Sequence, residues 1–142
     1  MKISEEVKKR IEEEYSEWFE NQYGNTTNEE RKKLGAVFTP PKVTIQILEM
    51  LDNLDGNILD PCCGSGNLLV AAILAGADPN NIYGNEFEPE FLRLAQDRLE
   101  KYGVPRWHNH QGDATKAESI RFDSFKPEYK NNKEELKQVS LW

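Results

Sequence analysis

Residues 57–67 read Asn-Ile-Leu-Asp-Pro-Cys-Cys-Gly-Ser-Gly-Asn, and this stretch decides the fold. Its apolar start predicts a short strand over residues 57–60 that ends at the carboxylate of Asp60. The two glycines then allow a tight turn, and the apolar run over residues 68–74 predicts a helix that opens directly out of it. The first N–H groups of a helix have no partner within it, so such a turn is suited to hold a ligand.

The sequence that follows repeats this alternation of short strands and helices. Residues 81–86 predict a second strand, residues 89–102 a long helix, and residues 104–110 a third strand. Strands and helices that alternate with short connections are typical of a parallel, doubly wound α/β sheet. We therefore expect a Rossmann-like sheet of about three to four mostly parallel strands.

An acidic side chain follows the end of each predicted strand. Asp60 is suited to pair with a positively charged group of the ligand. Glu86 comes 20 residues after Gly66, which is the position where Rossmann-type sites hold ribose hydroxyls. Asp113 is suited to accept from an adenine amino group. Each carboxylate alone has an ordinary explanation as a helix cap or a surface charge, but together they predict a site along one edge of the sheet.

Helices are expected in front of the sheet. Residues 4–23 form an amphipathic pattern with an aromatic stripe, residues 29–34 predict a short helix that Gly35 stops, and a further helix runs from Pro40 or Pro41 to about residue 51. The aromatic stripe either docks a partner or packs on its own domain, and the spacing favours packing.

The charge of the chain excludes some classes of function. The 142 residues carry a net charge of −7, and residues 36–115 hold five basic and eleven acidic side chains. An acidic domain repels phosphate backbones, so we expect contact with nucleic acid only indirectly or through a partner. No apolar run is long enough to span a membrane, and the N-terminus has no signal-peptide pattern. Together with two adjacent cysteines, this leads us to expect a cytoplasmic protein.

Two motifs resemble those of a known family. The run Asp60-Pro61-Cys62-Cys63-Gly64-Ser65-Gly66 resembles the S-adenosylmethionine loop, Asp-Pro-x-x-Gly-x-Gly, of the amino-methylating DNA methyltransferases. Upstream, Gly35-Ala36-Val37-Phe38-Thr39-Pro40 resembles the Gly-x-Tyr/Phe-Tyr/Phe-Thr-Pro segment of the adenine-methylating branch, with Val37 in place of the usual aromatic residue. Type I modification subunits share this order. The resemblance covers roughly residues 35–115, and it implies a class I methyltransferase fold with S-adenosylmethionine as cofactor.

The resemblance also implies roles for single residues. Phe38, Thr39 and Pro40 would contact the methionine part of the cofactor, Asp60 would lie near its amino group, Glu86 would hold the ribose and Asp113 the adenine. The cofactor-binding residues expected on this basis are Phe38, Thr39, Pro40, Asp60, Pro61, Cys62, Gly64, Gly66, Glu86 and Asp113.

The catalytic motif of the family, Asn/Asp-Pro-Pro-Tyr/Phe, has no counterpart in this sequence. The nearest run is Lys126-Pro127-Glu128-Tyr129, in which a lysine stands where the amide belongs. A charged lysine only donates hydrogen bonds, so it cannot accept from the target amine. We interpret the similarity as accidental, with a decayed motif as the alternative. We therefore expect no catalytic residue in this chain, with Tyr129 as the one candidate.

These observations predict a partial enzyme of three parts. Residues 1–35 form a helical segment, residues 36–115 a cofactor-binding half-domain, and residues 116–142 a polar tail with at most a short strand or helix. A truncated sheet leaves the strand over residues 57–60 at an open edge, which proteins generally cover. The tail, a second chain or a homodimer would cover it.

Three functions remain open at this point. The chain is part of an adenine methyltransferase that needs a catalytic partner, or an inactive protein that binds S-adenosylmethionine to sense or sequester it, or an interaction module that has lost the ligand. The complete set of expected cofactor residues disfavours the last.

The histidines and the cysteines are each expected to have a structural role rather than a chemical one. His108 and His110 would share one face of a strand, but they lack neighbouring cysteines or carboxylates, so a surface role at the strand end is expected rather than a metal site. Cys62 and Cys63 are expected to pack rather than to perform redox chemistry.

Overall fold

The computed structural model describes residues 1–116, apart from the side chains of residues 34–37. Helices come first, and strands then alternate with helices. The helices are α1 (Glu5–Tyr23), α2 (Asn28–Val37), α3 (Pro41–Glu49), α4 (Asn67–Leu74) and α5 (Pro89–Glu100). The strands are β1 (Ile58–Asp60), β2 (Ile82–Glu86) and β3 (Asn109–Gln111), and short 3₁₀ turns, η1 (Pro79–Asn81) and η2 (Arg106–His108), precede β2 and β3.

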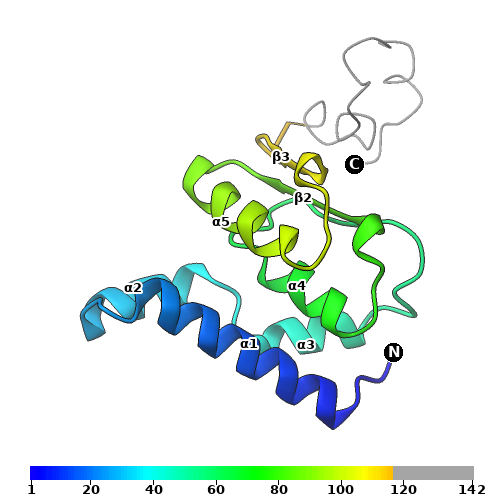
Figure 1. Cartoon of the computed structure of the whole chain (residues 1–142), viewed down its shortest axis with the longest axis horizontal. Coiled ribbons are helices and arrows are strands. Elements are labelled where there is room, and N and C mark those ends of the chain that lie inside the picture. Colours follow the sequence, from blue (N-terminus) through cyan, green and yellow to red (C-terminus); the bar gives the residue numbers. More distant parts are fainter. Residues whose placement is uncertain (117–142) are drawn as a thin grey trace.

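The described strands form one parallel sheet in the order β1-β2-β3. Ile58 pairs with Ile82, and Gly84 pairs with Asn109. In Figure 1, α4 and α5 lie between the strands and the long α1, which packs against α3 and α4. The fold is thus the expected α/β architecture, in which helices precede a parallel, Rossmann-like sheet with three strands among the described residues. Within the described residues, β1 is an edge strand.

The core lies between the sheet and the helices that connect its strands. Leu69 of α4, Ile82 of β2 and Leu99 of α5 are completely buried there. Gly84 of β2 faces α4 at such short range that a methyl group on it would lie 3.1 Å from the side chain of Leu69 and 2.8 Å from that of Asn109. A larger residue at this position would therefore force the side chains of Leu69 and Asn109 to shift.

The first helix docks on its own domain through its aromatic stripe, as the spacing predicts. The rings of Trp18, Phe19 and Tyr23 lie 5.4 to 6.4 Å from the ring of Phe38, which also contacts Phe91 of α5 at 5.5 Å. Such edge-on and tilted pairs are the favoured arrangement of aromatic rings.

Two predicted elements differ from the structure. Helix α2 continues through Gly35 to Val37, since a glycine weakens a helix without necessarily ending it. Its start is stabilised by a capping box, in which Glu30 N–H donates to Thr27 Oγ1 at 3.1 Å and Thr27 N–H donates to Glu30 Oε2 at 3.3 Å.

The third strand is shorter than residues 104–110. Pro105 has no N–H to give to a sheet, and the chain after it forms the turn η2, closed by a 3.0 Å bond from His108 N–H to the Pro105 carbonyl. The strand begins only at Asn109.

Residues 117–142, which hold nearly all of the expected polar tail and the run over residues 126–129 with Tyr129, lie outside the described residues. Over the described part of the chain, no helix combines the length and the apolar character needed to cross a membrane.

Candidate cofactor-binding site

The turn between β1 and α4 presents bare backbone at the end of the first strand. Gly64 and Gly66 have φ angles of +55° and +89°, in the left-handed region that glycine tolerates. A methyl group added to Gly64 would meet nothing within 4 Å, so this glycine borders open space. The side chain of Asp60 accepts from Cys62 N–H at 3.1 Å and thereby holds the beginning of the turn.

Glu86, at the end of β2, is fixed by two backbone donors. One carboxylate oxygen accepts from Gly64 N–H at 2.9 Å, and the other accepts from Glu88 N–H at 2.8 Å. Each oxygen keeps a further lone pair, because an ionised carboxylate has about four acceptor sites. The carboxylate is therefore oriented by the protein and can still accept two hydroxyl groups side by side.

Asp113 follows β3 and is held by Thr115. One oxygen of Asp113 accepts from the N–H of Thr115 at 2.9 Å and from its hydroxyl at 2.6 Å. These two hydrogen bonds lower the pKa of the Asp113 carboxyl from its usual value. The preceding Gly112 donates its N–H to the Glu86 carbonyl at 3.2 Å, which places the two strand ends side by side.

The charges of the three carboxylates all act on the thiol of Cys62. Burial raises the pKa of this thiol first, and the negative charges of Asp60, Glu86 and Asp113 raise it further. Burial is also the main cause that raises the pKa of Asp60, to which the charge of Glu86 adds. The structure thus brings the three predicted carboxylates together, and their combined field favours a ligand with positive charge.

A cavity of about 230 Å³ lies in front of the turn. Its wall includes five of the predicted site residues, namely Phe38, Thr39, Asp60, Cys62 and Gly64. The other five, Pro40, Pro61, Gly66, Glu86 and Asp113, do not line it, although Glu86 adjoins it through its bond to Gly64. Ser65 also lines the cavity, and among the described residues its buried hydroxyl has no hydrogen-bond partner.

Phe38 contributes to this wall while it belongs to the aromatic cluster. Its side chain is only 4% exposed. Next to it, the carbonyl of Thr39 accepts from the side-chain amide of Asn67 at 3.5 Å, so the segment before α3 is tied to the start of α4.

Several residues that organise this site were not predicted. The side-chain amide of Asn85 donates to the carbonyls of Pro61 and Gly112, at 2.9 and 3.0 Å, and thereby joins the ends of all three strands. An asparagine inside an otherwise apolar strand was the signal for this role. Phe87 directly follows Glu86 and is 60% exposed, and an exposed ring beside the carboxylate expected to hold ribose is suited to stack on a base. The sequence around Asn67 and Arg98 does not indicate that they contact the turn, because these contacts form only in the folded chain.

The two histidines do not share a strand face as expected. His108 precedes β3 and is buried rather than at the surface, with its ring stacked on Tyr83 at 4.2 Å. Its Nδ1 donates to the Ile82 carbonyl at 2.9 Å, and burial lowers the pKa of His108. The described residues hold no group of three or more metal-binding side chains. Cys63 is buried and Cys62 is exposed, so the expectation that both cysteines pack in the protein holds only for Cys63.

The chain is similar to methyltransferases of more than one kind. It is 32% identical over 122 residues to the type I restriction enzyme MjaIX methylase subunit of Methanocaldococcus jannaschii, a match that covers 82% of this chain and 21% of the relative. It is 33% identical over 73 residues to the type II methyltransferase M.VspI of a Vibrio species, covering 50% of this chain and 18% of the relative. A ribosomal protein L11 methyltransferase of Ectopseudomonas mendocina is 42% identical over 64 residues, covering 43% and 21%. The chain therefore spans about a fifth of the length of these relatives.

The N-6 DNA methylase family model matches residues 11–132. This match includes α3, the glycine turn and all three strands of the sheet. The chain therefore belongs to the N-6 DNA methylase family, and this membership implies S-adenosylmethionine as the methyl donor.

Proposed function

We propose that this chain is the S-adenosylmethionine-binding part of a DNA-adenine methyltransferase, and that a second chain or a further part of a longer protein supplies the catalytic motif. One observation carries the proposal. The Glu86 carboxylate is already held by Gly64 N–H and Glu88 N–H, so that the glycine turn and the expected ribose ligand form one rigid unit.

The donor set suits each part of the cofactor. S-adenosylmethionine supplies a methyl group that is activated by a positively charged sulfur, and it also carries an ammonium group. The negative field of Asp60 and its neighbouring carboxylates favours both positive charges. The methionine carboxylate suits the N–H groups at the start of α4. Glu86 suits the ribose diol, and Phe87 and Asp113 suit the face and the amino edge of adenine.

The comparisons support a cofactor role more strongly than a particular substrate. Relatives named as DNA methylases and relatives named as ribosomal protein methyltransferases match this chain. A region shared by enzymes with different targets serves what they have in common, which is the methyl donor. We assign DNA adenine as the target from the N-6 family match together with the Phe38-Thr39-Pro40 segment.

The surface around β1 supports a partner. Among the described strands β1 is one of the two edges, and four apolar side chains on and just after α3 are exposed. Unpaired edge strands and exposed apolar side chains are both features that proteins generally cover. The Methanocaldococcus jannaschii relative is named as the methylase subunit of a type I restriction enzyme, which fits an assembly of several chains. The exposed side chains are Val43, Ile47, Met50 and Leu51.

We further propose that DNA is contacted through that partner and that the protein works in the cytoplasm. The net charge of −7 disfavours direct binding to a phosphate backbone. A reducing compartment keeps the adjacent thiols of Cys62 and Cys63 unpaired, as they are in the structure.

The test is calorimetric titration of the wild-type chain and a Glu86→Gln variant with S-adenosylmethionine and S-adenosylhomocysteine. The wild type should bind both. The variant should bind at least roughly tenfold more weakly, because hydrogen bonds to a charged group contribute about 1.5–3 kcal/mol. Glu12→Gln, which makes the same charge change at an exposed position of α1, is the matched control and should leave the affinity unchanged.

Two results would count against the proposal. Equal affinities of wild type and Glu86→Gln would remove Glu86 from the ribose site. Absence of binding by the wild-type chain, with the fold intact by circular dichroism, would show that these residues do not bind the cofactor without further structure.

A further inference from the structure

Arg98 of α5 is a buried cation, and it has an unusual number of partners. Its side chain is only 5% exposed. One terminal nitrogen donates to the Ser65 carbonyl at 3.2 Å and to the side-chain oxygen of Asn67, and the other donates to the Glu14 carboxylate at 2.7 Å. The guanidinium carbon lies 4.0 Å from the centre of the Trp18 ring. A buried charge is tolerated only when it is paired in this way.

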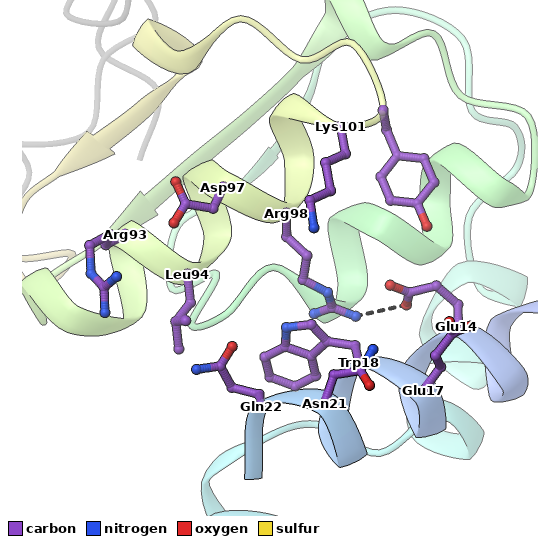
Figure 2. A pocket seen from close by; sticks show the side chains of 11 residues that line it. Glu14, Glu17, Trp18, Asn21, Gln22, Arg93, Leu94, Asp97, Arg98 and Lys101 are labelled. Atoms are coloured by element: carbon purple, nitrogen blue, oxygen red, sulfur yellow. Dashed lines mark hydrogen bonds and ion pairs between the residues drawn. The ribbon is translucent and has the colours of Figure 1, made fainter. Parts of the chain in front are cut away.

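These partners come from different parts of the chain. Figure 2 shows Arg98 reaching from α5 to Trp18 and Glu14 on α1, at the side of a cavity of about 440 Å³ between the two helices. Ser65 and Asn67 belong to the turn and the start of α4, 33 and 31 residues before Arg98. The guanidinium therefore joins the first helix to the glycine turn.

The partners in the turn also form the cofactor cavity. Ser65 and Asn67 both line the cavity of about 230 Å³. The amide of Asn67, whose oxygen accepts from Arg98, donates in turn to the carbonyl of Thr39, which also lines the cavity, at 3.5 Å. A chain of hydrogen bonds thus runs from Glu14 through Arg98 and Asn67 to Thr39.

We infer that Arg98 is a positioning residue of the cofactor site, which makes the shape of the glycine turn depend on the docking of α1. This inference rests on the proposed function. Arg98 does not line the cofactor cavity. It acts through Ser65 and Asn67, and Glu14 is the group on α1 that holds its charge in place.

The electrostatics explain why Glu14 matters to a site that it does not touch. Burial lowers the pKa of Arg98, and the charge and hydrogen bond of Glu14 oppose this effect. Without Glu14, the cation stays buried with only neutral partners, which is costly enough to draw the guanidinium toward water. Its bonds to Ser65 and Asn67 would then weaken. Thermodynamic linkage adds the converse: if the cofactor binds only when the turn is ordered, then binding of the cofactor also stabilises α1 in its docked position.

The test compares Glu14→Gln with Glu17→Gln in the full chain. Both changes remove one negative charge from α1 beside the same cavity, but only Glu14 pairs with Arg98 among the interactions of the described residues. Two quantities are measured: the dissociation constant for S-adenosylhomocysteine by calorimetry, and amide hydrogen exchange in residues 63–70 of the free protein. Glu14→Gln should weaken binding roughly threefold to thirtyfold and speed exchange in the turn, while Glu17→Gln should change neither.

A merely structural role gives a different pattern. If Glu14→Gln speeds exchange in α1 but leaves both the exchange of residues 63–70 and the dissociation constant as in the wild type, the inference is wrong. If the wild type binds no cofactor, the proposed function fails, and the exchange of residues 63–70 in the free variants still decides whether Arg98 transmits the state of α1 to the turn. Arg98→Lys should act in the same direction as Glu14→Gln, since an ammonium group does not reproduce the planar fork.

Discussion

Asp60 illustrates at the scale of one residue how a binding site opposes stability. Its carboxylate is partly buried and feels the negative charge of Glu86, and both effects raise its pKa from the usual value. A carboxyl whose folded pKa is raised favours folding below its unfolded pKa, and this contribution is lost as the pH rises through the folded value. At neutral pH the folded chain therefore holds a charge that it disfavours, and a cationic ligand would relieve it.

Replacing Asp60 by asparagine should consequently stabilise the free protein. Asparagine keeps an acceptor for Cys62 N–H but carries no charge. We expect a higher free energy of unfolding than in the wild type at pH 7, a difference that shrinks as the pH falls toward 4, and weaker binding of S-adenosylmethionine. Urea denaturation at several pH values and titration with the cofactor measure these effects.

Asp113→Asn provides the control with the opposite sign. Hydrogen bonds from Thr115 lower the pKa of Asp113, so its contribution to stability is present above its unfolded pKa and is lost as the pH falls. Asp113→Asn should therefore not stabilise the chain at pH 7. If Asp60→Asn destabilises the free chain at pH 7, the buried carboxylate is not a cost to folding.

Phe38 and Phe87 carry the same side chain in two different roles. Phe38 is 4% exposed in the aromatic cluster, and Phe87 is 60% exposed beside Glu86. Phe38→Ala should lower the free energy of unfolding by about 3–5 kcal/mol, as is usual for a buried phenylalanine. Phe87→Ala should change it by less than about 0.5 kcal/mol but should weaken cofactor binding.

Denaturation curves and titration of the two variants test this division. A large loss of stability in Phe87→Ala would show that Phe87 packs in the fold. Unchanged cofactor affinity in that variant would show that Phe87 does not contact the adenine.

At the scale of elements, the sequence predicts those whose signals are local. The helices α1, α3, α4 and α5 follow from apolar spacing and from caps such as Ser4, which accepts from Val7 N–H at 3.2 Å. Strand β3 was predicted too long, because the apolar start of the segment hid the effect of Pro105. The sequence predicts helix α2 too short, because Gly35 resembles a helix stop but costs a helix only about 1 kcal/mol.

The residues of the candidate site also divide into those that the sequence predicts and those that it does not. Asp60, Glu86 and Asp113 were predictable because the carboxyl ends of parallel strands always share one edge of the sheet. Arg98 was not, because its partners lie between 31 and 84 residues away in the chain. On a helical pattern alone, Arg98 is indistinguishable from a solvated arginine.

At the scale of the whole molecule, the helices and the strand ends form one connected arrangement. The aromatic cluster and Arg98 join α1 to the segment before α3 and to the glycine turn, and Asn85 joins the three strand ends. The acidic charge and the edge strand β1 remain on the surface of the described residues. This arrangement suits a cofactor-binding unit that leaves its target to a partner.

The central claim, that the three strand ends form one cofactor site, is tested most directly by mapping the amides of the isotopically labelled chain by nuclear magnetic resonance during titration with S-adenosylhomocysteine. The largest shifts should fall on Gly64, Phe87 and Asp113 and their neighbours, because these amides surround the expected ligand. Shifts centred instead on Asn21, Gln22 and Arg93, which line the cavity between α1 and α5, would contradict the claim, as would the absence of any shift at saturating ligand.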